Sequence, residues 1–354
     1  MTVPHAQPSA DAAAAAATQP LRLLREQHPP GPPGPPGPPL ITVVVCAYRH
    51  AAYIDECLAS VDATAPGIAI ELIVIDDGSP DDTLARCLAF AFRPDLRLRI
   101  YSKPNQGLVH SLQCALALAE GRYLAVMASD DCYVAGGLEQ VQAALLTSKP
   151  PVGALLCQAV YLSEPGSALN GRPVYGESHA ALFRGSAADR LDAVCTEYPK
   201  PLLLQASVFE TRLLHETGVW HDGLVLDDWP AFVHVFKAEA AQQTTLRYRS
   251  DIVLARYRLH AESAHNRLDR QLRLTEQVAR ELVPPRHRAV CLANVRIDIG
   301  LIHLYGGNPA YGLWLCLRGL LTAPRPRVLG RVWRRGARAL SRRLRPTALD
   351  QGAG

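Results

Sequence analysis

The 354-residue sequence predicts an α/β fold built on a mostly parallel sheet that is flanked by helices. Three observations support this prediction. Apolar runs of strand length alternate with segments in which apolar residues recur at helical spacing. The connections between the two kinds of segment are short, and polar residues follow directly after several of the apolar runs. In sheets of this kind ligands bind at the carboxyl ends of the strands, so we expect a site there.

The first strand–helix repeats begin at residue 40. The run LITVVVCAY (40–48) is β-branched and does not alternate, which predicts a strand covered on both faces. The segment IELIVIDDGSPDDT (70–83) predicts a second strand, an acidic turn and a helix that begins at about Thr83. Between these two strands, the segment 51–64 predicts a helix. Its apolar residues at helical spacing are Ile54, Cys57, Leu58 and Val61.

Two further strands follow in the same pattern. The segment LRLRIYSKPNQG (96–107) predicts a strand and a glycine turn, and residues 108–121 predict a helix that ends at Gly121. The run RYLAVMASDD (122–131) predicts a fourth strand. Because the carboxyl ends of parallel strands meet at one edge of a sheet, the residues that end the first, second and fourth strands are candidates for one site. They are Tyr48, Asp76, Asp77, Asp130 and Asp131.

We expect four parts in the chain. Residues 1–39 contain an alanine run and Gly-Pro-Pro triplets, which are too few to hold a collagen triple helix, so they predict a disordered leader. The α/β domain covers residues 40–265, and a helical extension covers residues 266–324. Residues 325–354 predict an Arg-rich tail that is either an amphipathic helix or disordered.

Positive charge is concentrated toward the C-terminus. From Gly312 onward there are ten arginines, no lysine and one acid, whereas the preceding 311 residues carry 27 basic and 32 acidic groups. Basic amphipathic segments can lie on anionic membrane surfaces, and we expect this of the tail, with a solvated tail as the alternative. Nucleic-acid binding by the arginines is less favoured.

Cysteine usage and hydropathy indicate a cytoplasmic protein. The nine cysteines are scattered singly without a Cys-x-x-Cys pair, which favours reduced thiols over a disulfide framework. The N-terminus lacks the basic start and apolar stretch of a signal peptide. The sequence has no run of about 18 apolar residues that could span a bilayer. We therefore expect a cytoplasmic protein whose tail contacts the inner face of the membrane as a peripheral anchor.

Asp130 and Asp131 are adjacent carboxylates at the end of a predicted strand. Side-by-side carboxylates repel each other unless a cation or water separates them. Mg²⁺ and Mn²⁺ prefer oxygen ligands, and Mg²⁺ usually binds through one or two carboxylates together with substrate phosphates. The pair therefore predicts a divalent metal site that holds a phosphate-bearing ligand. A solvated acidic turn is the alternative.

Asp76 and Asp77 form a second acidic pair, in the segment VIDDGS (74–79). For Asp76, a helix cap or an Asx turn explains the residue as well as a binding role does. A role in the turn explains Asp77 less well than Asp76. The Asp77 carboxylate could instead accept a hydrogen bond from the ring N–H of a base. Tyr48 offers a flat face on which that base could stack. The two residues predict a nucleotide site.

The order and spacing of these motifs resemble the family 2 glycosyltransferases with the GT-A fold. The matching segments, between about residues 40 and 265, are VVVCAYRH, IELIVIDDGSPDDT, KPNQGLVHSLQCALALAEGRYLAVMASDD and QASVFETRLLHETGVWHDGLVLDDWPAFVHV. The resemblance implies a Rossmann-like sheet and the inverting transfer of a sugar from a nucleoside-diphosphate sugar, with Mn²⁺ or Mg²⁺. It also implies a saccharide or lipid-linked acceptor, in the synthesis of surface polysaccharide or glycoconjugate.

The resemblance gives roles to the strand-end residues of this sequence. Tyr48 would flank the nucleobase, and Asp77 would bind its ring nitrogen. Asp130 would lie near the ribose, and Asp131 would ligate the metal that bridges the diphosphate. Lys103 would place a positive charge near the nucleotide, although a solvated surface lysine explains it nearly as well.

The catalytic base is implied by LVLDDWPAF, which resembles the Glu-Asp-Trp element of the family. An inverting displacement needs one carboxylate to accept the proton of the incoming hydroxyl, and that residue would be Asp228. Asp227 takes the place of the Glu, with a helix N-cap as its alternative. His260, in ARYRLHAESAHN, would approach the metal and the diphosphate, and a structural histidine is its alternative. Ala128 replaces the first acid of the family's Asp-x-Asp-Asp element, which is compatible with fewer protein ligands to the metal.

The sequence also bears on other functions. No Gln-x-x-Arg-Trp element follows Asp228, so the resemblance implies transfer of a single sugar. A sugar-phosphate nucleotidyltransferase would need a Gly-rich basic loop after the first strand, and CAYRHAAY contains no glycine. A degenerate module that binds a nucleotide without catalysis is disfavoured by Asp228 and weakly favoured by Ala128. A Rossmann dehydrogenase is excluded, because no Gly-x-Gly-x-x-Gly follows Val45.

Overall fold

The strand–helix repeats predicted from the sequence are present in the computed structural model of the chain. The structure describes residues 20–29, 40–65, 68, 70–163, 167, 169–196, 202–259, 268–306 and 308–324. The chain divides into two compact units. Residues 1–187 and 201–261 make up the first, and residues 188–200 and 262–354 make up the second.

Four parallel strands in the first unit are the four that the sequence predicts. Their spatial order is β4-β3-β2-β5. Every residue of β2 and β3 is buried, as expected for largely apolar strands that are covered on both faces. The strands are β2 (Ile41–Ala47), β3 (Ile70–Asp76), β4 (Arg97–Ser102) and β5 (Tyr123–Ala128).

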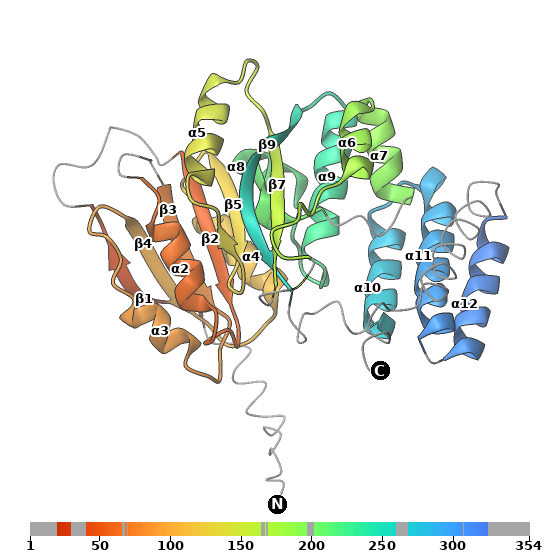
Figure 1. The fold of residues 1–354 in the computed structure, drawn as a ribbon, viewed down its shortest axis with the longest axis horizontal. Helices are drawn as coiled ribbons and strands as arrows, with labels where there is room; N and C mark the ends of the chain where they lie inside the picture. The colour runs from red at the N-terminus through yellow and green to blue at the C-terminus, as the bar shows by residue number, and fades with distance from the viewer. Residues whose placement is uncertain are drawn as a thin grey trace, which may run out of the picture. The chain divides into compact units, whose positions relative to one another are not determined.

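Helices connect these strands, as the sequence predicts, and Figure 1 shows α2 and α3 lying across them. They are α2 (Ile54–Asp62), α3 (Thr83–Ala89) and α4 (Leu108–Leu118). The buried residues of α2 are the ones whose spacing predicted it: Ile54, Cys57, Leu58 and Val61. The predicted α/β fold with a mostly parallel central sheet is therefore confirmed for this part of the chain.

A further strand, β1 (Arg22–Gln27), pairs antiparallel with β4. The prediction that residues 1–39 form a disordered leader is therefore wrong for β1. Arg25 and Gln27 donate side-chain hydrogen bonds of 2.7–3.1 Å to four backbone carbonyls between residues 88 and 96. The strand is held by these polar contacts and by backbone pairing with β4, which would otherwise be an edge strand. Because it lacks a buried apolar face, its sequence carries no periodic signal.

The second half of the sheet is mixed. In the described part of the chain the nine strands have the order β1-β4-β3-β2-β5-β8-β7-β9-β6. β8 runs antiparallel to β5 and β7, whereas β9 runs parallel to β7. The additional strands are β6 (Cys132–Tyr133), β7 (Ala154–Leu162), β8 (Ser207–Glu210) and β9 (Leu246–Arg258). The helices of this half are α5 (Gly137–Thr147), α6 (Glu177–Arg184), η1 (Leu204–Ala206), α8 (Thr211–Thr217) and α9 (Asp228–Ala240).

The second unit is helical, which confirms a C-terminal helical extension. Its helices are α7 (Ala187–Thr196), α10 (Leu268–Glu281), α11 (Pro285–Tyr305) and α12 (Pro309–Thr322). Residues 188–200 belong to this unit, although the sequence analysis placed them in the α/β domain. The reason is a pair of long-range contacts from α11. The Asn294 amide donates to the carbonyl of Thr196, and His287 Nδ1 lies 3.1 Å from Asp192 Oδ1.

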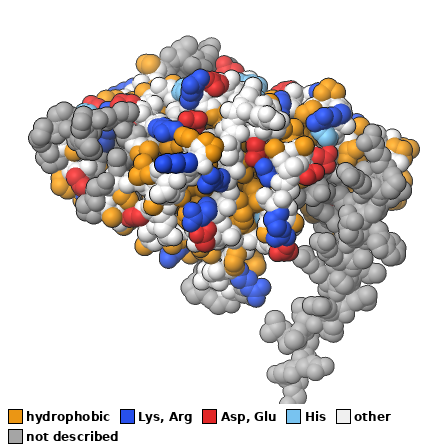
Figure 2. Space-filling view, turned by 90° about the horizontal axis from the view of Figure 1, so that it is seen from above, with side chains coloured by type: hydrophobic (Ala, Val, Ile, Leu, Met, Phe, Trp, Pro, Cys, Tyr) orange, Lys and Arg blue, Asp and Glu red, His pale blue; other side chains and the backbone are white. Residues whose placement is uncertain are grey.

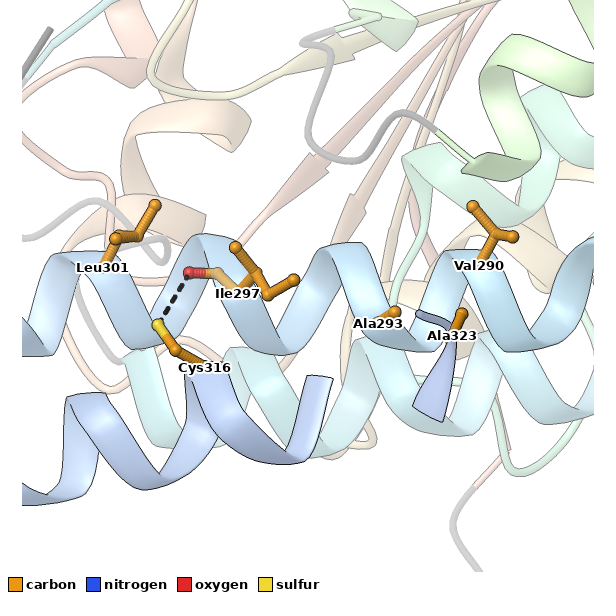
Figure 3. Packing of buried hydrophobic residues seen from close by; sticks show 6 residues of the cluster. All are labelled: Val290, Ala293, Ile297, Leu301, Cys316 and Ala323. Carbon is orange, nitrogen blue, oxygen red and sulfur yellow. Dashed lines mark hydrogen bonds between the residues drawn. The ribbon is translucent and has the colours of Figure 1, made fainter. Parts of the chain in front are cut away.

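Helices α11 and α12 pack closely through small residues. A Cβ at Gly312 would lie 2.4 Å from Leu304 N, and one at Gly319 would lie 2.8 Å from Ala293 O. Figure 3 shows the apolar contact between the two helices, in which Cys316 Sγ lies 3.9 Å from Ile297 O. Because any larger side chain at these glycines would push the helices apart, this contact depends on glycine.

The surface carries charges of both signs. Over the face seen in Figure 2, basic and acidic side chains are interspersed and apolar side chains are exposed between them. Across the described ranges, no helix is both long enough and apolar enough to span a bilayer. The nine cysteines are free thiols. The predicted Arg-rich tail, residues 325–354, lies outside the described residues.

Candidate active site

The carboxyl ends of the parallel strands meet at one edge of the sheet. Backbone pairing aligns Ala47 with Asp76, and Asp76 with Ser102. Two further hydrogen bonds extend this alignment past the strands, from Asp77 N to Ala47 O at 2.9 Å and from Lys103 N to Asp76 O at 3.1 Å. On the other side β2 pairs with β5 up to Ala128. The polar residues that follow each strand are therefore brought together, as predicted.

Asp76 shapes the turn after β3. It is buried, and its carboxylate accepts hydrogen bonds from Ser79 N at 3.2 Å and from Ser102 Oγ at 3.3 Å. The chain then turns through Gly78, whose φ of +66° is a left-handed conformation that suits glycine. The structural alternative, a turn-forming aspartate, is therefore what the structure shows for Asp76.

Asp77 and Lys103 form a buried pair. The Lys103 ammonium donates to Asp77 Oδ1, which also accepts from Gln106 N at 2.9 Å. Asp77 Oδ2 accepts from Gly107 N at 2.9 Å. Lys103 is only 4% exposed, so its alternative as a solvated surface lysine is wrong. These bonds tie the loop of residues 103–107 to β3. A carboxylate has about four acceptor positions, so Asp77 Oδ2 can accept one more hydrogen bond.

Tyr48 follows β2 directly and is 41% exposed, so its ring lies at the surface of this edge. The next residue, Arg49, has a φ of +59°, which turns the chain sharply away from the strand. Its amide donates to Ser79 Oγ at 3.2 Å and so joins the turn after β2 to the turn after β3. An aromatic face at this position is accessible to a ligand.

Asp131 is buried in the turn after β5. Its Oδ1 accepts a 2.6 Å hydrogen bond from Arg258 N. Its Oδ2 is also buried and has no hydrogen-bond partner in the described part of the chain. Burial, and then the charge of Asp130, raise the pKa of Asp131 well above its usual range, although the amide and the charge of Arg258 and the side chain of Gln205 oppose this. Burial outweighs these partners, so the charged form of the carboxylate is disfavoured.

Arg258 and His50 also lie beside Asp130 and Asp131, and neither was predicted from the sequence as a site residue. Arg258 Nε donates to Asp130 O at 2.7 Å, and its guanidinium pairs with Glu56 while lying 5.0 Å from the ring centroid of Tyr53. His50 Nδ1 lies 2.7 Å from Ser129 Oγ, and Nε2 lies 4.0 Å from Asp130 Oδ2. Arg258 lies in the segment ARYRLHAESAHN, two residues before His260, which lies outside the described residues.

Asp227 and Asp228 lie at the start of α9 and are partly buried. Asp227 occupies the N-cap position, but its side chain makes no capping hydrogen bond, so its helix-cap alternative is not supported. Burial and the charge of Asp228 raise the pKa of Asp227 to about 7. Burial also raises the pKa of Asp228, although the amide of Trp229, which donates to its Oδ1, opposes this.

Two of the acidic pairs act on the same tyrosine, Tyr257. Burial raises the pKa of Tyr257, and the charges of Asp131, Asp130 and Asp228 raise it further. The Tyr257 hydroxyl therefore lies within the fields of both the β5 pair and the α9 pair. Its ring centroid lies 6.2 Å from that of Tyr161. No motif singles out Tyr257 in the sequence, because its place depends on the pairing of β9 with β7.

Residues 42–166 match the profile described as glycosyl transferase family 2. This stretch runs from β2 past the end of β7 and includes both strand-end acidic pairs. Within residues 42–166, the chain therefore carries the sequence pattern of the family 2 glycosyltransferases. The resemblance stated from the sequence is confirmed.

Curated relatives match part of this chain. It is 39% identical over 104 residues to an uncharacterized glycosyltransferase of Haemophilus influenzae, a stretch that is 29% of this chain and 31% of the relative. It is 33% identical over 92 residues to the chondroitin synthase of Pasteurella multocida, a stretch that is 26% of this chain and 9% of the relative. The match therefore spans about a third or less of the length of these two relatives.

A solved structure shares the fold of this chain. The mannosyltransferase PcManGT from Pyrobaculum calidifontis, solved in complex with GDP-Man and Mn²⁺, is similar with a TM-score of 0.51 and 18% identity. The similarity covers 93% of this chain and 86% of that one. The predicted GT-A fold is confirmed.

The acidic residues at the strand ends fit a hard divalent cation. Across the described residues, no group of three or more His, Cys, Asp or Glu side chains is arranged to hold a metal. The candidate donors are the carboxylates of Asp130 and Asp131, which the sequence predicts as a metal site. The buried Oδ2 of Asp131, which lacks a hydrogen-bond partner there, would be satisfied by such a cation. Two carboxylates suit a metal that takes its other ligands from a diphosphate.

Proposed function

We propose that the protein is an inverting, metal-dependent glycosyltransferase that moves one sugar from a nucleoside-diphosphate sugar to an acceptor hydroxyl. One observation carries the proposal. The buried Asp131 carboxylate has an oxygen without a hydrogen-bond partner in the described residues, and it lies at the same sheet edge as Asp77 and near the Asp227 and Asp228 pair. These positions support one site that combines a proposed metal ligand, a proposed nucleotide contact and a proposed base.

The donor nucleotide would bind across the ends of β2 and β3. In this proposal the exposed ring of Tyr48 stacks on the base. Asp77 accepts a hydrogen bond from a ring N–H through its remaining acceptor position. Lys103 acts through Asp77, because the buried ammonium pairs with that carboxylate and ties down the loop that follows. Asp130, at the end of β5, lies near the ribose.

The diphosphate would be held through a divalent metal, Mn²⁺ or Mg²⁺, bound by Asp131 with Asp130. The complex of the Pyrobaculum calidifontis mannosyltransferase with GDP-Man and Mn²⁺ supports this. When bound, such a cation offsets the negative charge that develops on the departing diphosphate. His260 remains a proposed third ligand. Arg258 holds the turn that carries both carboxylates.

Asp228 is the proposed catalytic base. As the acceptor oxygen forms its bond to the anomeric carbon, the bond from that carbon to the diphosphate oxygen breaks, and the carboxylate takes the hydroxyl proton. The attack comes from the side opposite the leaving group, so the anomeric configuration inverts. Partial burial raises the pKa of both Asp228 and Asp227, which makes the pair more basic than a solvated aspartate.

The acceptor would be a saccharide or a lipid-linked hydroxyl, in the synthesis of surface polysaccharide or glycoconjugate. The similarity to a chondroitin synthase supports a role in polysaccharide synthesis. A lipid-linked acceptor would require the enzyme to work at a membrane, and the nine arginines between residues 325 and 346 would contact anionic lipid there. We accordingly propose a cytoplasmic protein that is peripheral on the inner face of the membrane.

A thermal-shift screen of nucleoside diphosphates, with Mn²⁺ or with EDTA, tests the donor site. We expect at least one diphosphate to raise Tm, and to do so only in the presence of the metal. Incubation of the matching nucleotide sugar with acceptors should then release the nucleoside diphosphate. Release of pyrophosphate from a nucleoside triphosphate and a sugar phosphate would instead identify a nucleotidyltransferase. Binding without any turnover would identify a degenerate module.

A further inference from the structure

Helix α12 exposes a continuous apolar face. Leu313, Trp314, Leu317 and Leu321 are 53%, 49%, 51% and 84% exposed. At 100° per residue these four side chains fall within an arc of about 100° on the helix. The opposite face is buried against α11, and it consists of Gly312, Leu315, Cys316 and Gly319. The helix is therefore apolar on both sides.

Such a face is unusual for a helix at the surface of a soluble protein, whose outer side is normally polar. Helix α10, in the same unit, shows the ordinary arrangement. Its exposed residues are all charged, and they are Asp269, Arg270, Arg273, Arg280 and Glu281. The outer face of α12 carries a single charge, that of Arg318. The difference between the two helices shows that the apolar face is a property of α12 and not of the whole unit.

The length of α12 limits what the face can do. Its 14 residues span about 21 Å, whereas the hydrocarbon core of a bilayer is about 30 Å thick. The helix is too short to cross a bilayer, and one side of it is already occupied by α11. An apolar partner can therefore meet it only along its length, as the surface of a membrane would.

Charge and aromatic residues favour an anionic membrane over other partners. The Arg318 guanidinium lies 5.1 Å from the ring centroid of Trp314, and the Tyr311 ring stacks on Trp314 at 5.6 Å. Trp, Tyr and Arg are typical of the boundary between lipid and water. Immediately after the helix, residues 325–346 contain nine arginines and no acid. Two copies of this chain would bring these arginines together, whereas anionic lipid would neutralise them.

We propose that Leu313, Trp314, Leu317 and Leu321 form a face that docks on an anionic membrane, with the arginines of residues 325–346 bound to the lipid headgroups. The apolar face supplies one anchoring signal and the arginines supply the other. Stable peripheral binding generally takes two such signals, because each alone is marginal. The proposal concerns the second unit and does not rest on the sugar-transfer chemistry.

Co-sedimentation of the full chain with vesicles tests the face. The vesicles contain phosphatidylcholine with or without phosphatidylglycerol. We expect the wild type to bind the anionic vesicles, and Leu317→Asn to weaken the partition coefficient by about tenfold or more. Asparagine adds no charge, so the loss cannot come from repulsion by lipid. The matched control is Leu146→Asn on α5, which alters a side chain that is 65% exposed and should leave binding unchanged.

A second measurement tests the depth of insertion. In a Trp333→Phe background, bilayers with brominated acyl chains should quench Trp314, because Trp220 and Trp229 are buried at 5% and 7% exposure. Quenching should fall when Trp314→Phe is added. Equal sedimentation of wild type and Leu317→Asn, or a bound protein whose Trp314 is not quenched, would overturn the proposal. A lipid-free dimer that Leu317→Asn converts to monomer, without any vesicle binding by the wild type, would assign the face to a second copy and also overturn it.

Discussion

The backbone amide of Arg258, the last residue of β9, donates a 2.6 Å hydrogen bond to Oδ1 of Asp131, in the turn after β5. This bond occupies one oxygen of the buried carboxylate and leaves the other for a ligand. The Arg258 side chain also holds the carbonyl of Asp130 at 2.7 Å. The two proposed metal ligands are therefore fixed by a strand that lies more than a hundred residues further along the chain.

Arg258→Gln should weaken metal-dependent donor binding without unfolding the protein. The variant keeps the backbone bond to Asp131 but loses the bond to Asp130 O and the pairing with Glu56. A hydrogen bond from a charged donor contributes roughly 1.5–3 kcal/mol, so we expect about tenfold weaker binding by calorimetry in Mn²⁺. Arg256→Gln, at an exposed position of the same strand, is the control. Equal losses in both variants would show that Arg258 has no special role.

Asp131→Asn should abolish metal-dependent donor binding and leave the fold intact. Because its folded-state pKa is raised, the carboxyl stabilises the fold at acid pH, and this contribution is lost as the pH rises. The neutral variant should therefore melt at least as high as the wild type at neutral pH without ligand. Asp82→Asn, at an exposed position without a capping bond, is the control. Equal donor affinity of Asp131→Asn with Mn²⁺ and with EDTA would contradict the metal assignment.

Asp228→Asn should remove sugar transfer while sparing donor affinity. A positioned base typically contributes about 10²–10⁴-fold to the rate, and asparagine preserves the shape of the side chain without the basicity. Asp227→Asn is the matched comparison, and turnover per folded molecule is the measurement. Because Asp227 makes no capping bond, we do not expect the loss of about 1 kcal/mol that removing a helix cap would cause. If Asp228→Asn keeps more than a tenth of the wild-type rate of sugar transfer while Asp227→Asn is inactive, the catalytic base is Asp227 and not Asp228.

The rate of sugar transfer should rise with pH through about 7, because the pKa of Asp227 is raised to about 7 beside Asp228. Below that pH the pair holds a proton and is a weaker base. Stability should change in the opposite direction. The contribution of this carboxyl is fully present below its unfolded pKa of 3.8 and is lost as the pH rises through about 7.

Comparing Tm at pH 5 and pH 8 for the wild type and Asp227→Asn tests this dependence. The variant should gain stability relative to the wild type at pH 8. A wild-type rate that is flat between pH 5.5 and 8, or an Asp227→Asn variant that loses stability at pH 8, would show that burial does not raise this pKa.

Removal of residues 325–354 should leave hydrolysis of the donor nearly unchanged and release the protein from anionic vesicles. None of these arginines has a proposed role in the strand-end site, and the proposed apolar face of α12 alone would bind only marginally. Steady-state hydrolysis and vesicle co-sedimentation are the two measurements. Full retention on vesicles by the truncated chain would mean that the tail is not an anchor.

The sequence by itself determined the local structure and the positions of the acidic residues. Predominantly apolar runs of strand length fix where β2, β3 and β5 lie, because strand preference is a property of a few neighbouring residues. The polar residues that stop these runs then necessarily lie at the carboxyl edge of a parallel sheet. For this reason Asp77 and Asp131 could be assigned to one site before the structure was known.

Only the tertiary structure decided which partners these carboxylates have. Lys103 is buried against Asp77, Arg258 holds Asp131, and Tyr257 lies near two acidic pairs. Each of these contacts joins residues that are far apart in the chain, so it depends on the order and register of nine strands and not on local preference. The same reason explains β1, whose pairing with the edge of β4 leaves no periodic pattern in its own sequence.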